Sequence, residues 1–128
     1  MPALAVSKPI PDSSARVEAR LKSSIQVKAL IRRCDLATIG VAVTARGDPD
    51  AGAILVKLCG RDAGAAVLAQ ARRADGTLGW LRATGAALVA ESDADAYIAR
   101  QRQRDPDLWV VEIETVAPDT VLDDGIIE

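Results

Sequence analysis

Four segments with strand character follow one another between residues 39 and 83, and the connections between them are too short to hold a helix. They are IGVAVTAR (39–46), GAILVKLCG (52–60), AAVLAQARR (65–73) and TLGWLRA (77–83). Parallel neighbours need a long crossover, so these short connections favour antiparallel hairpins. Asp75 and Gly76 strengthen the last hairpin, because Asp-Gly supplies the positive backbone angles of a tight turn. We expect the first two segments to pair with each other, and the last two likewise.

One helix is expected before this run of strands and one after it. In SSIQVKALIRRC, Ser23 and Gln26 have capping-box spacing and precede an apolar stripe with helical spacing. The second helix lies in ESDADAYIARQRQRDPD, where Ser92 is the expected N-cap and Pro106 ends the helix. A last strand follows in LWVVEIETV (108–116).

This order of elements predicts an α+β fold with a mostly antiparallel sheet of about five strands and two helices packed on one face. A length of 128 residues fits one domain. Three prolines among the first eleven residues predict a mobile N-terminal arm over residues 1–16. The domain then spans 17–116, and residues 117–128 are expected to form an acidic C-terminal tail.

Charge is distributed unevenly along the chain. Residues 1–64 carry 10 basic and 6 acidic side chains, whereas residues 65–128 carry 6 and 12. After Arg104 there are eight acids and no basic residue. This pattern disfavours a nucleic-acid binder with a uniformly basic surface. It permits self-association or a basic partner at the C-terminal side.

The residue types also limit the chemistry. The chain has no histidine, which removes the commonest general base and the usual transition-metal ligand. Cys34 and Cys59 lie inside apolar segments, where a free cysteine behaves as a small hydrophobic residue. No phosphate-binding loop motif occurs. We therefore expect no cofactor, no metal and no catalytic residue. The N-terminus lacks the charged start and long apolar stretch of a signal peptide, and no apolar run has the length of a membrane span. We therefore expect a soluble cytoplasmic protein.

The loop RGDPDAG (46–52) holds the first candidate binding residues. Arg46 has a rigid donor fork that suits a carboxylate or phosphate, but it could equally pair with Asp48 or Asp50 inside the loop. The two aspartates could bind a cation with further oxygen ligands, yet Asp beside Pro is ordinary turn chemistry. The internal pair and the turn are the favoured interpretations.

The first helix and the last strand supply the remaining candidates. Lys28, Arg32 and Arg33 lie off the apolar stripe of the helix and could form a contact surface. Trp109 opens the last strand and is the aromatic candidate for binding.

Three stretches of the chain stand out as a set: RLKSSIQVKALIRRC, RGDPDAGAILVK and AYIARQRQRDPDLWVVEIE. Together they resemble a bacterial domain-of-unknown-function family, number 1491. The departures are Gln26, where the family often has a large aromatic residue, and the segment around Trp80. The resemblance implies a small soluble bacterial protein, and it brings no activity, cofactor or catalytic residue to carry over.

The sequence favours a non-catalytic interaction or accessory protein over an enzyme. Its partner would be another protein or a second copy of the chain. It would bind through a sheet edge, the basic face of the first helix or the acidic C-terminal end. One alternative is a domain that binds a small ligand or anion, or a weak hydrolase, through the 46–52 loop. A third hypothesis, nucleic-acid binding by the first helix, is disfavoured by the acidic pI of 5.2 and the scarcity of aromatic residues.

Overall fold

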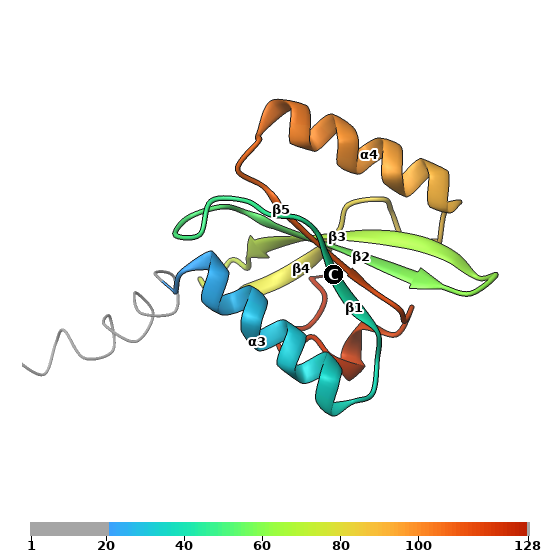
Figure 1. The fold of residues 1–128 in the computed structure, drawn as a ribbon, viewed down its shortest axis with the longest axis horizontal. Coiled ribbons are helices and arrows are strands. Elements are labelled where there is room, and N and C mark those ends of the chain that lie inside the picture. Colours follow the sequence, from blue (N-terminus) through green and yellow to red (C-terminus); the bar gives the residue numbers. More distant parts are fainter. Residues whose placement is uncertain (1–20, 128) are drawn as a thin grey trace, which may run out of the picture.

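The computed structural model describes residues 21–127 and contains one sheet with a helix on either side of it (Figure 1). The elements, in chain order, are α3 (Ser23–Leu36), β1 (Val41–Ala45), β2 (Ile54–Gly60), β3 (Gly64–Arg72), β4 (Leu78–Arg82), α4 (Glu91–Arg104), β5 (Trp109–Ile113) and the short 3-10 helix η1 (Pro118–Thr120). The α+β prediction is confirmed. The expected N-terminal arm lies outside the described residues.

The strands are arranged in the order β1-β5-β2-β3-β4. All neighbouring pairs are antiparallel except β2 and β5, which run parallel. The predicted hairpin of β3 and β4 is confirmed. The predicted pairing of β1 with β2 is wrong, because β5 lies between them. Burial gives the reason: β2 and β5 are buried on both faces and need interior positions, whereas β1 alternates between half-buried and exposed residues and suits an edge.

The two helices pack on opposite faces of the sheet, so the expectation that both share one face is wrong (Figure 1). Successive residues of a strand point to opposite faces. In β2, Ile54, Val56 and Leu58 join the core beneath α3. Leu55 points the other way, into a second cluster with Ala94 of α4. Interior strands with apolar residues on both faces need cover on both faces.

The helices begin without the predicted side-chain caps. Lys22 and Ala90 are the N-cap residues, and neither makes a side-chain cap hydrogen bond. Ser23 is buried inside the first turn of α3, and its hydroxyl donates to the carbonyl of Gly52 at 2.5 Å. Ser92 lies one residue inside α4. Ser23 thus connects the helix to a distant loop, which the local capping pattern does not reveal.

The C-terminal segment, residues 118–127, packs on the domain and does not form the expected tail. Val121 and Leu122 are buried in the core beneath α3. The N–H of Trp80 donates to Gly125 O at 2.9 Å, and the N–H of Ile127 donates to Trp80 O at 2.8 Å. These bonds cover the outer edge of β4. Among residues 21–127, no helix has the length and apolar character needed to cross a membrane.

Candidate functional site

The three stretches that carry the family resemblance meet at one corner of the fold, formed by the start of α3, the 46–52 loop and the loop before β5. The N–H of Ser24 donates to Pro49 O at 2.9 Å, which satisfies a free donor of the first helical turn. The N–H of Asp48 donates to Asp107 O at 3.0 Å. The indole N–H of Trp109 donates to Asp48 O at 2.7 Å. These bonds join stretches that are far apart in the sequence.

Within this corner, the predicted binding residues of the loop make structural contacts. The Asp48 carboxylate accepts the N–H groups of Asp50 at 3.2 Å and Ala51 at 2.7 Å, as the turn interpretation expects. Arg46 lies over the ring of Trp109, 5.3 Å from the ring centroid. The indole ring, rather than Asp48 or Asp50, is therefore the partner of Arg46. Ligand binding by these residues stays a prediction.

The three basic residues of α3 do not share one surface. Lys28 and Arg32 are exposed and lie one turn apart on the outer side of the helix. Arg33 is half-buried and turns toward the C-terminal segment. Its Nε donates to Val121 O at 2.8 Å, and its Nη1 lies 3.5 Å from Asp123 Oδ2.

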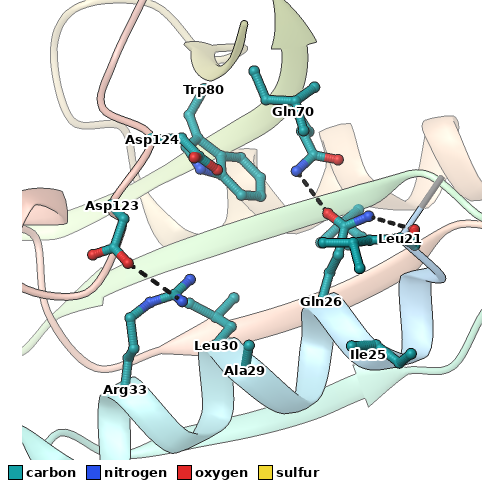
Figure 2. A pocket seen from close by; sticks show the side chains of 12 residues that line it. Leu21, Ile25, Gln26, Ala29, Leu30, Arg33, Gln70, Trp80, Asp123 and Asp124 are labelled. Carbon is teal, nitrogen blue, oxygen red and sulfur yellow. Dashed lines mark hydrogen bonds and ion pairs between the residues drawn. The ribbon is translucent and has the colours of Figure 1, made fainter. Parts of the chain in front are cut away.

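A pocket of about 190 Å³ opens between α3, β4 and the C-terminal segment (Figure 2). We call it the Trp80 pocket. Buried apolar side chains line its interior: Leu30, Ile54 and Trp80. Leu21 and Ile25 line it too, and these two are 42% and 49% exposed, which is high for large apolar residues. Ala29, Leu78, Gln26, Gln70, Arg33, Asp123 and Asp124 complete the lining.

The two ends of the Trp80 pocket differ in chemistry (Figure 2). At one end, Gln70 Nε2 donates to Gln26 Oε1 at 3.0 Å, and Gln26 Nε2 donates to Leu21 O at 2.9 Å. At the other end Arg33 faces Asp123. An apolar interior between an amide end and a charged end is typical of a site that binds an apolar group and orients it through a few polar contacts.

A second hollow adjoins the Trp80 pocket along the C-terminal segment. Its volume is about 380 Å³. Its lining residues are Pro118, Asp119, Leu122, Asp123, Gly125 and Ile126. Asp123 lines both hollows. Because the titratable groups in its lining are the carboxylates of Asp119 and Asp123, we call it the acidic hollow.

On the opposite face of the sheet, α4 is held by a charge network around Lys57. This side chain is buried, and its Nζ lies 2.7 Å from Glu91 Oε2, 2.7 Å from Asp95 Oδ1 and 3.5 Å from Glu112 Oε1. Burial by itself lowers the pKa of the Lys57 ammonium. Hydrogen bonds to Asp95 and Glu91 outweigh this effect, and the pKa is raised above its ordinary value.

The thiol of Cys59 lies beside this network. Its Sγ and carboxylate oxygens of Glu91 and Glu112 lie within 4.8 Å of one another. The Lys57 ammonium already supplies positive charge to these carboxylates. Burial, followed by the charge of Glu112, raises the pKa of the Cys59 thiol, and burial likewise raises the pKa of Cys34. Both thiols are therefore protonated at neutral pH and are weak nucleophiles.

Sequence reasoning missed the Trp80 pocket, although α3 carries a visible signal. Ile25 and Ala29 are four residues apart, which puts them on one side of α3, and Leu21 continues the same spacing just before the helix begins. That side lies apart from the stripe that enters the core. A second apolar stripe on a short helix indicates a further contact, but the partner residues Gln70, Trp80 and Asp123 come from distant segments.

The fold and its pocket define a class: an α+β domain with a helix on each face of a mixed sheet and a small apolar pocket beneath one helix. Comparison with known families then gives the particular family. Residues 21–123 match the family described as "Protein of unknown function (DUF1491)", and the chain belongs to this family. A search of curated proteins found no match.

Solved structures of the same family are similar to this chain. A crystal structure of a DUF1491 family protein from Caulobacter crescentus CB15 has a TM-score of 0.74 and 39% identity, over 84% of this chain and 99% of that one. An NMR structure of a family protein from the same organism has a TM-score of 0.71 and 38% identity, over 84% and 97%. The solution structure of protein Atu0922 from A. tumefaciens has a TM-score of 0.66 and 34% identity, over 80% and 92%.

Proposed function

We propose that this chain is a non-catalytic interaction protein that accepts an apolar side chain of a partner protein in the Trp80 pocket. The observation that carries this proposal is an apolar pocket with the exposed side chains of Leu21 and Ile25 in its lining. Exposed apolar groups around a well-formed pocket, rimmed by polar residues, are typical of protein interaction sites.

Taken by itself, the Trp80 pocket has the size of one apolar side chain. Pockets for drug-sized ligands measure roughly 300–1,000 Å³. The Trp80 pocket measures about 190 Å³. An apolar cavity of about 150 Å³ holds a benzene molecule, so a pocket slightly larger than this suits one apolar side chain. Anchors of this kind contribute most of the affinity in many interfaces.

Neither alternative gains comparable support. The polar side chains of the 46–52 loop are engaged within the loop, with Lys22 or with Trp109, which leaves the small-ligand hypothesis without an observation in its favour. The basic residues of α3 are divided between two surfaces, which does not favour nucleic-acid binding. As part of the proposal, we place the protein in the cytoplasm. Its two unpaired cysteines fit a reducing compartment.

The test is affinity purification from the native host with a variant that fills the pocket. Ala29 is exposed and lines the pocket, so Ala29→Trp adds a large side chain there without disturbing buried residues. We expect the wild-type chain to retain a protein in stoichiometric amount and Ala29→Trp to lose it.

The matched control is Ala99→Trp, since Ala99 is an exposed alanine of α4 on the other side of the sheet. This variant is expected to retain the same protein as the wild type. If Ala29→Trp retains the same proteins in the same amounts, or if the wild type retains none, the proposal is refuted.

A further inference from the structure

The acidic hollow beside the Trp80 pocket indicates the chemistry of the partner. We propose that the partner segment carries a lysine or arginine beside its apolar anchor, and that this basic group enters the acidic hollow when the anchor enters the Trp80 pocket. The inference rests on the proposed function and specifies the partner for the same site.

The two hollows adjoin each other at Asp123. Asp123 lines both, so a group leaving the charged end of the Trp80 pocket meets the acidic hollow next. The amide pair of Gln26 and Gln70 occupies the opposite end (Figure 2). An occupant therefore has an acidic environment at one end of its anchor and a neutral one at the other.

The hollow is lined by acidic side chains. Its lining holds two aspartates, Asp119 and Asp123, and no basic residue. The side chain of Asp123 is 75% exposed, and its ion pair with Arg33 is long, at 3.5 Å. Arg33, whose Nε donates to Val121 O, supplies one positive charge beside the two carboxylates of the hollow, so a net negative charge remains. A basic group adds favourable charge pairs there, whereas a carboxylate meets repulsion.

The backbone of the segment that lines the hollow is anchored at both ends. Trp80 forms part of the pocket, and its backbone also bonds to Gly125 and Ile127 on either side of Ile126. Val121 and Leu122 anchor the other end of the segment in the core. The backbone that carries Asp123 is therefore held against the apolar interior, and a binding surface with a preformed backbone binds with a smaller entropic cost.

The test uses four acetylated and amidated peptides that differ in the anchor or in its flanks: KKLKK, SSLSS, EELEE and KKSKK. Basic residues on both sides of the leucine make the result independent of the direction of binding. Binding is followed by NMR, through the indole signal of Trp80, the methyl signals of Ile25 and the amide signals of residues 119–125.

At low salt we expect KKLKK to bind about tenfold more tightly than SSLSS, and EELEE to bind more weakly than SSLSS. KKSKK, which lacks the anchor, is expected to leave the Trp80 and Ile25 signals unchanged. Because exposed charges are screened by salt, the advantage of KKLKK should shrink to about twofold or less at 0.5 M salt.

The double variant Asp119→Asn, Asp123→Asn isolates the acidic hollow. It should remove the preference for KKLKK over SSLSS while SSLSS still shifts the Trp80 signal. Asp93→Asn, an exposed aspartate at the start of α4, is the matched control and should preserve the preference.

The inference is overturned if KKLKK and EELEE bind equally at low salt, or if the preference survives in the double variant. Binding of SSLSS without a charge preference would remove this inference and leave the proposed function intact. If no peptide shifts the Trp80 signal, the inference fails, and the Ala29→Trp purification then judges the proposed function on its own. Sedimentation that shows a dimer sensitive to Ala29→Trp would identify the occupant as a second copy and also overturn the inference.

Discussion

Lys57→Met tests whether the charge network holds α4 on the sheet. Methionine keeps a stem of similar length, so the change removes the ammonium and leaves the packing of the buried side chain nearly intact. The ammonium makes two 2.7 Å contacts, with Glu91 and Asp95. Without it, these carboxylates and that of Glu112 are left close together and repel one another.

The expected cost follows from the exposure of the partners. A hydrogen bond to a charged group contributes about 1.5–3 kcal/mol when buried, and exposed pairs contribute about 0–1 kcal/mol. Glu91 and Asp95 are 62% and 58% exposed, so each contact lies near the boundary of these ranges. At about 1 kcal/mol for each contact, Lys57→Met should lower the free energy of unfolding by about 2 kcal/mol. Lys57→Ala also removes three buried heavy atoms, at about 0.8 kcal/mol each, and should cost about 4 kcal/mol.

Urea unfolding followed by circular dichroism gives both values. The control is Lys28→Met, because Lys28 is exposed and its substitution should change stability by less than about 0.5 kcal/mol. In the background Glu91→Gln, Asp95→Asn, the cost of Lys57→Met should fall to about half or less. If Lys57→Met unfolds at the same urea concentration as the wild type, or costs as much without the two acids, the network does not stabilise the protein.

The pH dependence gives an independent check. The pKa of Lys57 is raised in the folded protein, so its contribution is fully present below the unfolded-state pKa of about 10.4 and is lost as pH rises through the higher folded-state pKa. The stability difference between the wild type and Lys57→Met should therefore be constant between about pH 7 and 9 and decrease only above about pH 10.5. A difference that decreases between pH 7 and 9 would contradict the raised pKa.

Three further predictions concern the loop corner and the thiols. Gly52→Ala should lower the free energy of unfolding by more than about 2 kcal/mol, measured with urea, because the alanine Cβ would lie 2.2 Å from the carbonyl oxygen of Asp107. A decrease of about 0.5 kcal/mol or less, as for an exposed substitution, would contradict this packing. Trp109→Phe removes the indole N–H that donates to Asp48 O and should lower the free energy of unfolding by about 1–3 kcal/mol in the same assay. An unchanged free energy of unfolding would refute a stabilising role for that bond. Cys34 and Cys59 should react with a disulfide reagent at pH 7 more slowly than free cysteine does, since both pKa values are raised; labelling of the native protein at the rate of free cysteine would show that this is wrong.

The local elements could be predicted from the sequence because each depends on nearby residues. The turn at Asp75 and Gly76 has the positive angle expected of glycine there, with φ of 90° at Gly76, and it joins β3 to β4 as predicted. The strand order could not be predicted in the same way. Connection length favoured pairing of β1 with β2, but the burial of β5 on both faces decides its position between them.

Side-chain roles that depend on distant partners were also beyond the sequence. Ser23 has the right spacing for a cap, yet its hydroxyl bonds to Gly52, 29 residues away. Arg46 has aspartates beside it and still lies over Trp109. The Trp80 pocket depends in the same way on contacts between α3, β4 and the C-terminal segment, which local patterns do not specify.

The positions of the family stretches and of the pocket suggest how relatives could differ. The three stretches that carry the resemblance meet in a corner whose backbone bonds hold the start of α3, the 46–52 loop and the start of β5 together. The two departures from the resemblance, Gln26 and the segment around Trp80, both contribute to the pocket lining. A large aromatic residue at position 26 could not form the amide pair with Gln70 that closes one end of the pocket. The first shared stretch thus also supplies Leu21, Ile25 and Arg33 to the pocket, and the departure at Gln26 changes the end that the amide pair closes, so a relative with an aromatic residue at that position should differ from this chain at that end.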